Sequence, residues 1–181
     1  METAGMNIDG TNVMLIDTPG FDDTYRSDTE ILELISKHLS ITYEAGKLLN
    51  GLVIVQPVTG NRVQGNERRQ TRLLEKIIGP NNYHKIIIIT TMWSLLKDEE
   101  QGERRVNERI KDKDFWGPMI AKGARVIKHD DTPESAIKIV KMLYSKPKGE
   151  LLMQTELNKN GGSLLKTSAG IVCRLVVLFV V

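Results

Sequence analysis

Four consecutive residues, Asp17-Thr18-Pro19-Gly20, directly follow the apolar run from Val13 to Ile16. A carboxylate at the tip of a hydrophobic strand is suited to hold Mg²⁺, and a glycine three residues later can bring a bare backbone N–H to a phosphate group. The alternative is a plain turn at the end of a strand, because proline followed by glycine is common turn chemistry. The surrounding elements must decide between a metal and phosphate site and a turn.

A phosphate site of this kind also needs a glycine-rich loop of the form G-x-x-x-x-G-K-S/T, and no segment of the chain matches it. The stretches beginning at Gly5 and Gly60 have the glycine spacing but lack the lysine, so both are predicted to be turns. Only 16 residues precede Asp17, whereas a strand, phosphate loop, helix and next strand occupy roughly 30 or more. We therefore expect a chain that lacks these elements at its N-terminal side.

Other catalytic chemistries find little support. His38, His84 and His129 are far apart in sequence with no cysteine or glutamate at metal-ligand spacing, and Cys173 has no nearby base. A single cysteine excludes an intramolecular disulfide, and the first residues lack the apolar core of a secretory signal. We expect a reducing, cytoplasmic environment.

The composition limits the classes of fold and partner. The chain has 181 residues, of which 40% are hydrophobic, enough for one domain plus a tail. The formal net charge of +2 comes from interspersed charges, which argues against a nucleic-acid partner. The apolar C-terminal stretch from Ile171 to Val181 is shorter than the ~20 residues that span a bilayer, so no membrane span is expected. An aggregation-prone or partner-buried strand is the alternative for that stretch.

Strand-length apolar runs alternate with helix-length amphipathic stretches, which predicts a parallel sheet covered by helices on both faces. The N-terminus adds a predicted hairpin with a two-residue Asp9-Gly10 turn. The predicted strands are Asn12 to Asp17, Leu52 to Gln56, Lys85 to Thr91 and Ala124 to Lys128. The predicted helices begin after Ser27, near Asn66, near Lys97 and at Thr132-Pro133, and end near Gly46, Ile78, Asp112 and Lys146.

Local signals define several of these helices. Ser27 and Glu30 form a capping box. The helix from Lys97 is mostly charged, so we expect it to be peripheral and to bury only Val106 and Ile110. The last of these helices is expected to bury a separate apolar set, Ala136, Val140, Leu143 and Tyr144.

The segment from Val13 to Thr24, with its D-T-P-G-F-D-D core, resembles the septin and immune-associated nucleotide-binding branch of P-loop GTPases, and particularly fungal G-domain proteins of that group. The strand ending Thr90-Thr91-Met92-Trp93 and the segment from His129 to Ser135 are also similar. The resemblance covers Met6 to about Tyr144. It implies a three-layer α-β-α sandwich of the P-loop NTPase (G domain) type, without the first strand, phosphate loop and first helix.

The resemblance implies roles for particular residues. Asp17 would hold Mg²⁺, Thr18 would lie on the nucleotide side of the turn, the Gly20 N–H would contact the γ-phosphate, and residues 21–26 would form the switch. Phe21 stands where some GTPases place a water-orienting glutamine, so no catalytic residue is assigned.

The base-reading motif N/T-K-x-D of the family aligns with Thr91-Met92-Trp93-Ser94. Met92 can replace the apolar lysine stem, but a Ser94 hydroxyl cannot accept both guanine N–H groups as a carboxylate does. His129 falls in the last base-side loop, where capping of the next helix is the alternative. For Trp93 we expect packing between strand and helix rather than base stacking.

In the family's sheet, the missing strand lies between the strand ending at Asp17 and the strand from Leu52. Three outcomes are open: the two strands pair directly, a partner chain fills the slot, or the apolar tail does.

The resulting hypothesis is a GTP-binding protein of the septin-like class, truncated or degenerate, with a G domain at 1–146 and a linker and irregular, apolar-ended tail at 147–181. Its ligands would be GTP or GDP and Mg²⁺, with weak binding and slow hydrolysis. The alternative is a nucleotide-free pseudo-GTPase that binds partners, including further copies, through the sheet edge or helices. A peripheral membrane protein that uses the tail is the third possibility.

Overall fold

The structure is a computed structural model that describes residues 1–21, 25–59 and 65–177. The chain divides into two compact units. Unit 1 comprises Met1–Leu48, Leu73–Gly79 and Gly149–Val181, and unit 2 comprises Leu49–Arg72 and Pro80–Lys148. Each unit is described by itself.

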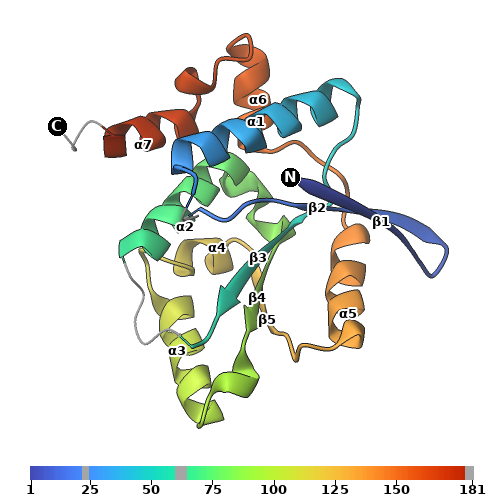
Figure 1. Cartoon of the computed structure of the whole chain (residues 1–181), viewed down its shortest axis with the longest axis vertical. Coiled ribbons are helices and arrows are strands. Elements are labelled where there is room, and N and C mark those ends of the chain that lie inside the picture. Colours follow the sequence, from blue (N-terminus) through green and yellow to red (C-terminus); the bar gives the residue numbers. More distant parts are fainter. Residues whose placement is uncertain (22–24, 60–64, 178–181) are drawn as a thin grey trace. The chain divides into compact units, whose positions relative to one another are not determined.

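A three-stranded parallel sheet forms the centre of unit 2 (Figure 1). Its strands are β3 (Leu52–Pro57), β4 (Ile86–Thr91) and β5 (Arg125–Lys128), in the order β3-β4-β5. The isoleucines at 86–88 are fully buried, which confirms that this β-branched run forms the central strand. All three strands begin within a residue of their predicted starts.

Helices cover the sheet of unit 2 on both sides, with α5 (Pro133–Tyr144) on one side and α3 (Glu99–Lys111) and α4 (Gly117–Ala121) on the other (Figure 1). The short 3-10 helices η1 (Pro80–Lys85) and η2 (Trp93–Leu95) flank β4. Helix α5 buries Ile139 and Leu143 against Ile87 of β4. The prediction for α5 was wrong in part: Ala136 is exposed and Val140 and Tyr144 are half-buried, because the sheet-facing stripe is centred on Ile139 and Leu143.

Helix α3 also differs from the expectation. Val106 and Ile110 are only half-buried, and the buried positions are Gly102 and Arg109. Glu100 and Arg104 form an ion pair one helical turn apart, with 3.5 Å between Oε2 and Nη1. A charged helix thus packs through a glycine and an arginine rather than through an aliphatic stripe.

The predicted hairpin is present in unit 1. Strands β1 (Glu2–Ile8) and β2 (Thr11–Asp17) pair antiparallel in continuous register from Glu2 opposite Asp17 to Ile8 opposite Thr11. Asp9 (φ 49°) and Gly10 (φ 81°) form the left-handed two-residue turn.

Unit 1 also contains a group of packed helices: α1 (Asp28–Glu44), α6 (Leu152–Lys159), the 3-10 helix η3 (Leu164–Lys166) and α7 (Ser168–Val177). The capping box of α1 is confirmed, since Ser27 Oγ accepts from the Glu30 amide at 3.3 Å and Glu30 Oε2 accepts from the Ser27 amide at 2.8 Å. Buried Gln154 of α6 donates to the Leu39 carbonyl of α1 at 3.3 Å. Helix α2 (Gly65–Ile78) contributes its first eight residues to unit 2 and the rest to unit 1.

The C-terminal region differs from the predicted irregular tail, because α6 and α7 are regular helices. Residues 171–177 are helical, so this part of the tail does not supply the additional strand proposed above. Residues 178–181 lie outside the described part. No described helix is both long enough and apolar enough to cross a bilayer. The boundary predicted after residue 146 stays a prediction.

Strands β2 and β3 belong to separate sheets, one with two strands and one with three. Direct pairing between them is therefore not formed. Within residues 1–21, 25–59 and 65–177, β2 has a partner strand only in β1, and β3 only in β4.

Candidate nucleotide site

The carboxyl ends of β3, β4 and β5 meet at one edge of the sheet in unit 2, with Pro57 in register with Thr91 and Thr90 with Lys128. The loops that leave this edge, residues 58–59, 92–98 and 129–132, are called the crest below. Ligands of open α/β sheets bind outside the carboxyl ends of the strands. Of the predicted base-side residues, Met92, Ser94 and His129 lie at the crest, and Thr91 ends β4 directly before it.

Met92 has a left-handed backbone, with φ 61° and ψ 31°. Its side chain is 46% exposed, and its sulfur lies 4.0 Å from the Thr59 hydroxyl. A left-handed non-glycine residue costs about 1–2 kcal/mol and persists only where its surroundings hold it. The Thr91 carbonyl accepts from the Val58 amide at 3.0 Å, which ties the end of β4 to the loop after β3. Ser94 is exposed in η2.

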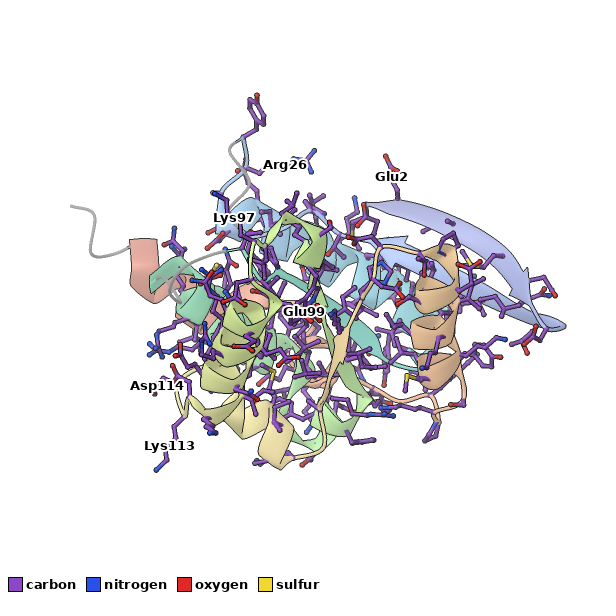
Figure 2. All side chains as sticks on the ribbon, turned by 90° about the horizontal axis from the view of Figure 1, so that it is seen from below. Glu2, Arg26, Lys97, Glu99, Lys113 and Asp114 are labelled. Atoms are coloured by element: carbon purple, nitrogen blue, oxygen red, sulfur yellow. The ribbon has the colours of Figure 1, made fainter. Side chains whose placement is uncertain are left out.

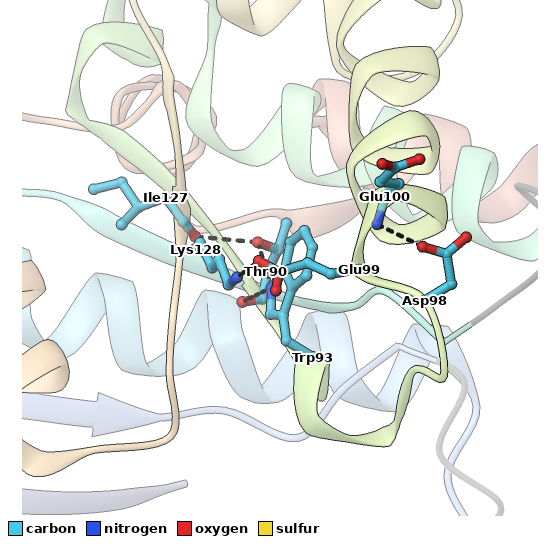
Figure 3. Close-up of polar contacts among 7 residues, drawn as sticks. All are labelled: Thr90, Trp93, Asp98, Glu99, Glu100, Ile127 and Lys128. Carbon is cyan, nitrogen blue, oxygen red and sulfur yellow. Dashed lines mark hydrogen bonds and ion pairs between the residues drawn. The ribbon is translucent and has the colours of Figure 1, made fainter.

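The Trp93 side chain packs against the protein near the carboxyl end of β4 and is not presented to a ligand (Figure 3). Its indole Nε1 donates to the Thr90 carbonyl at 3.0 Å and lies 3.1 Å from the Thr90 hydroxyl. The Lys128 ammonium lies 4.5 Å from the centre of the ring and pairs with Glu99. On α3, the missing side chain of Gly102 makes room for the edge of the Trp93 ring and for the Leu96 side chain. This geometry agrees with the expected packing role.

His129 begins the loop after β5. Its amide donates to the Thr90 carbonyl at 2.9 Å, and its Nδ1 lies 2.9 Å from the Ser135 hydroxyl. Asp130 Oδ1 accepts from the Thr132 hydroxyl at 2.6 Å, and this hydrogen bond holds the pKa of the Asp130 carboxyl below its usual value. Thr132 in turn caps α5 through the Ser135 amide. Capping is thus present in this loop, and His129 remains half-buried beside it.

The charged helix α3 supplies two arginines that contact the backbone at the carboxyl end of β3 and that sequence reasoning missed. Arg105 Nη1 donates to the carbonyls of Val58 and Thr59, at 2.8 and 3.2 Å. Arg109 Nη1 donates to the Pro57 carbonyl at 2.9 Å, and its side chain is 3% exposed, so burial lowers its pKa. The two arginines, four residues apart on one helical face, together hold the carboxyl end of β3. That spacing was the available signal.

The remaining predicted residues, Asp17, Thr18 and Gly20, belong to unit 1, so the structure does not place them relative to the crest. They lie at the carboxyl end of β2, and all three are exposed. Within the described ranges, no hydrogen bond or ion pair engages the Asp17 carboxylate. Part of the predicted switch, residues 22–24, lies outside the described residues.

Asp17 and Thr18 supply hard oxygen donors, which fit Mg²⁺. Mg²⁺ in phosphoryl-transfer sites is held by one or two carboxylates together with the ligand's phosphates, so a single carboxylate is compatible with it. Over residues 1–21, 25–59 and 65–177, no group of three or more His, Cys, Asp or Glu side chains could hold a metal by itself.

Comparisons with known proteins support the fold. No family model matches the chain. No curated protein matches it significantly either. Among solved structures, the chain is similar to Toc33 from Arabidopsis thaliana in a dimerization-deficient mutant form, with a TM-score of 0.56 and 16% identity. The fold is of the G-domain type. The match covers 70% of this chain and 54% of the Toc33 chain, so this chain spans about half the length of that structure.

Proposed function

We propose that the chain binds a guanine nucleotide as a member of the septin-like GTPase class, with the base along Met92 at the crest of unit 2. The roles of Asp17 toward Mg²⁺ and of the Gly20 N–H toward the γ-phosphate belong to this proposal as predictions from the sequence. The crest carries this proposal: three parallel strands end at one edge, and Met92 is held there in a strained left-handed conformation with its thioether exposed. The similarity in fold to Toc33 supports a G-domain architecture for the chain.

The proposal includes weak binding and slow hydrolysis. Backbone amides and a lysine of a phosphate loop supply most phosphate contacts in such sites, and residues 1–181 contain no such motif. The residue after Gly20 is Phe21, which cannot orient a water molecule. We also propose a cytoplasmic location, based on the single cysteine.

A titration with fluorescent GTP, with and without Mg²⁺, tests the proposal. Asp17→Asn should abolish the dependence on Mg²⁺, because it removes the only charged ligand proposed for the metal. Asp9→Asn is the matched control, since Asp9 lies at the opposite end of the same hairpin and asparagine tolerates its left-handed backbone. Equal Mg²⁺ dependence in both variants would remove Asp17 from the site.

The base side has its own test. Ser94→Asp supplies the carboxylate that can accept from both guanine N–H groups, and it should raise the affinity for GTP over ATP about tenfold. Leu95→Asp is the control, because Leu95 is the exposed neighbour in the same 3-10 helix. An unchanged GTP to ATP ratio in Ser94→Asp would place the base elsewhere.

The open strand edges favour a second candidate, a nucleotide-free interaction module. Strand β3 pairs only with β4 in the described part of the chain, and Val53 and Val55 beside its free edge are exposed, Val55 to 58%. Such an edge is a template for association. Sedimentation analysis should then show self-association that Val55→Lys reduces, and a monomer at all concentrations would exclude association of copies through this edge.

A further inference from the structure

Four cationic residues of unit 2 lie at the end of its sheet opposite the crest. Lys85 precedes β4, Lys122 follows α4, Arg125 begins β5, and Lys146 follows α5. These four residues are called the basic end below. They come from four separate segments, so only the tertiary structure brings them to one end of the sheet.

Printed contacts link these segments. Arg125 is in register with Ile87, two residues after Lys85. The Lys146 ammonium donates to the His84 carbonyl. The backbone at Gly123 lies against His84, since a Cβ built on Gly123 would meet His84 Cβ at 3.2 Å.

Lys122 and Lys146 are held in place by neighbouring groups. The Lys122 ammonium lies 5.8 Å from the centre of the Tyr83 ring. The Asn50 amide donates to the carbonyls of Tyr144 and Lys146, at 3.3 and 2.7 Å, which fixes the turn that carries Lys146.

The charges at the basic end are not balanced. Residues 80–97, 115–129 and 135–149 contain no aspartate or glutamate. In the described part of the chain, no carboxylate pairs with Lys85, Lys122, Arg125 or Lys146. Burial and the nearby Arg125 guanidinium lower the pKa of Lys146, as expected for a cation that faces another cation without a counterion.

The carboxyl end of α5 explains only part of this charge. A helix macrodipole places about half a negative charge at that end. Four cations exceed it severalfold, and Lys85 is buried at 5% exposure, where an uncompensated charge is costly. A bound anion would offset the excess.

We propose that the basic end binds a compact, multiply charged anion, the phosphate group or groups of a soluble ligand. Lys122 and Arg125 are exposed and can reach the ligand directly, while half-buried Lys146 and buried Lys85 add to the field. Lysine binds phosphate as a point charge and arginine binds it through two parallel hydrogen bonds. A single carboxylate would leave most of the charge unbalanced.

The chemistry of the surroundings favours a soluble ligand over a surface. None of the exposed large hydrophobic side chains lies in residues 80–85, 122–125 or 145–148, so there is no apolar anchor for a bilayer. Four cations at one end of a sheet also form no stripe along which a nucleic acid could lie. The site is separate from the proposed nucleotide site at the crest.

Calorimetric titration of the full chain with pyrophosphate, at ionic strength held constant with sodium chloride, tests the proposal. Saturable binding is expected, weakened about tenfold by Arg125→Gln and less by Lys122→Gln. Lys113→Gln is the control, because Lys113 projects into solvent after α3 (Figure 2). Asp17→Asn should leave this binding unchanged, which separates it from the proposed nucleotide site.

Equal affinity of Arg125→Gln and Lys113→Gln for pyrophosphate would overturn the proposal, as would the absence of saturable binding. Binding to vesicles of phosphatidylserine and phosphatidylcholine without binding to pyrophosphate would also overturn it, in favour of a membrane surface. Both variants replace exposed side chains, and circular dichroism melting should show an unchanged fold. If Arg125→Gln melts early, the Lys122→Gln result decides.

Discussion

Gly102→Ala tests whether Trp93 is held as tightly as the crest geometry requires. A Cβ on Gly102 would lie 2.6 Å from Leu96 Cδ1, 2.7 Å from Trp93 Cζ3 and 3.1 Å from Trp93 Cε3. The leucine methyl can move by rotation of its side chain. The indole ring cannot move in this way, because its Nε1 donates a hydrogen bond to the Thr90 carbonyl and the Lys128 ammonium lies over its face.

Two opposing effects decide the outcome of Gly102→Ala. Replacement of a helical glycine by alanine stabilises by about 1 kcal/mol through backbone propensity. Overpacking against a fixed group costs typically about 1–3 kcal/mol. With the ring fixed, we expect net destabilisation of about 1 kcal/mol, which lowers the melting temperature by about 2–4 °C for a chain of this size.

Urea unfolding followed by circular dichroism and tryptophan fluorescence measures this change. Asn107→Ala is the matched control, because Asn107 is exposed on the same helix and gains propensity without any new contact. It should stabilise by a few tenths of a kcal/mol. Stabilisation of Gly102→Ala by about 1 kcal/mol would refute the reasoning, since it would mean that the ring moves freely.

Three further predictions concern local interactions. Asp112 accepts two hydrogen bonds from Arg68, which hold the pKa of the Asp112 carboxyl below its usual value. The resulting stability is present above about pH 4 and is lost as pH falls through the folded-state pKa. Asp112→Asn should therefore flatten the dependence of stability on pH in that range, and parallel pH profiles of the two proteins would contradict this. Met92→Gly should raise the urea midpoint by relieving a left-handed backbone worth about 1 kcal/mol, and a lower midpoint would contradict this. Ser27→Ala should destabilise α1 by about 1 kcal/mol, and a smaller loss in Ser27→Ala than in Glu30→Ala would show that the serine cap is not the main contact.

Much of the fold could be predicted because its signals are local. The β-branched run before Thr91 and the Asp9-Gly10 turn each specify a backbone conformation by themselves, and the strands appear where these signals lie. The tail was predicted wrongly for the same reason: an apolar run has no period that separates a buried strand from a buried helix. In the structure the segment is helical, and this helix, α7, contacts α1 and η3.

The candidate site was only partly predictable. Residue types at strand ends indicated Met92 and His129, because the carboxyl ends of parallel strands face ligands, and the role of Asp17 stays a prediction. The arginines of α3 were missed, since a charged helix normally faces solvent and nothing local shows that Arg109 is buried at 3% exposure. The spacing of Arg105 and Arg109 was the one available signal, and it does not show that Arg109 donates to a backbone carbonyl of β3.

The sequence by itself determined the local conformations, the strand-helix alternation and the residue types at the strand ends, because backbone propensity, capping and turn chemistry act over a few neighbouring residues. Only the tertiary structure decided which faces became buried, that β2 and β3 lie in separate sheets, and that four cations share one end of a sheet. These outcomes depend on contacts between residues distant in the chain, whose energies no local pattern encodes.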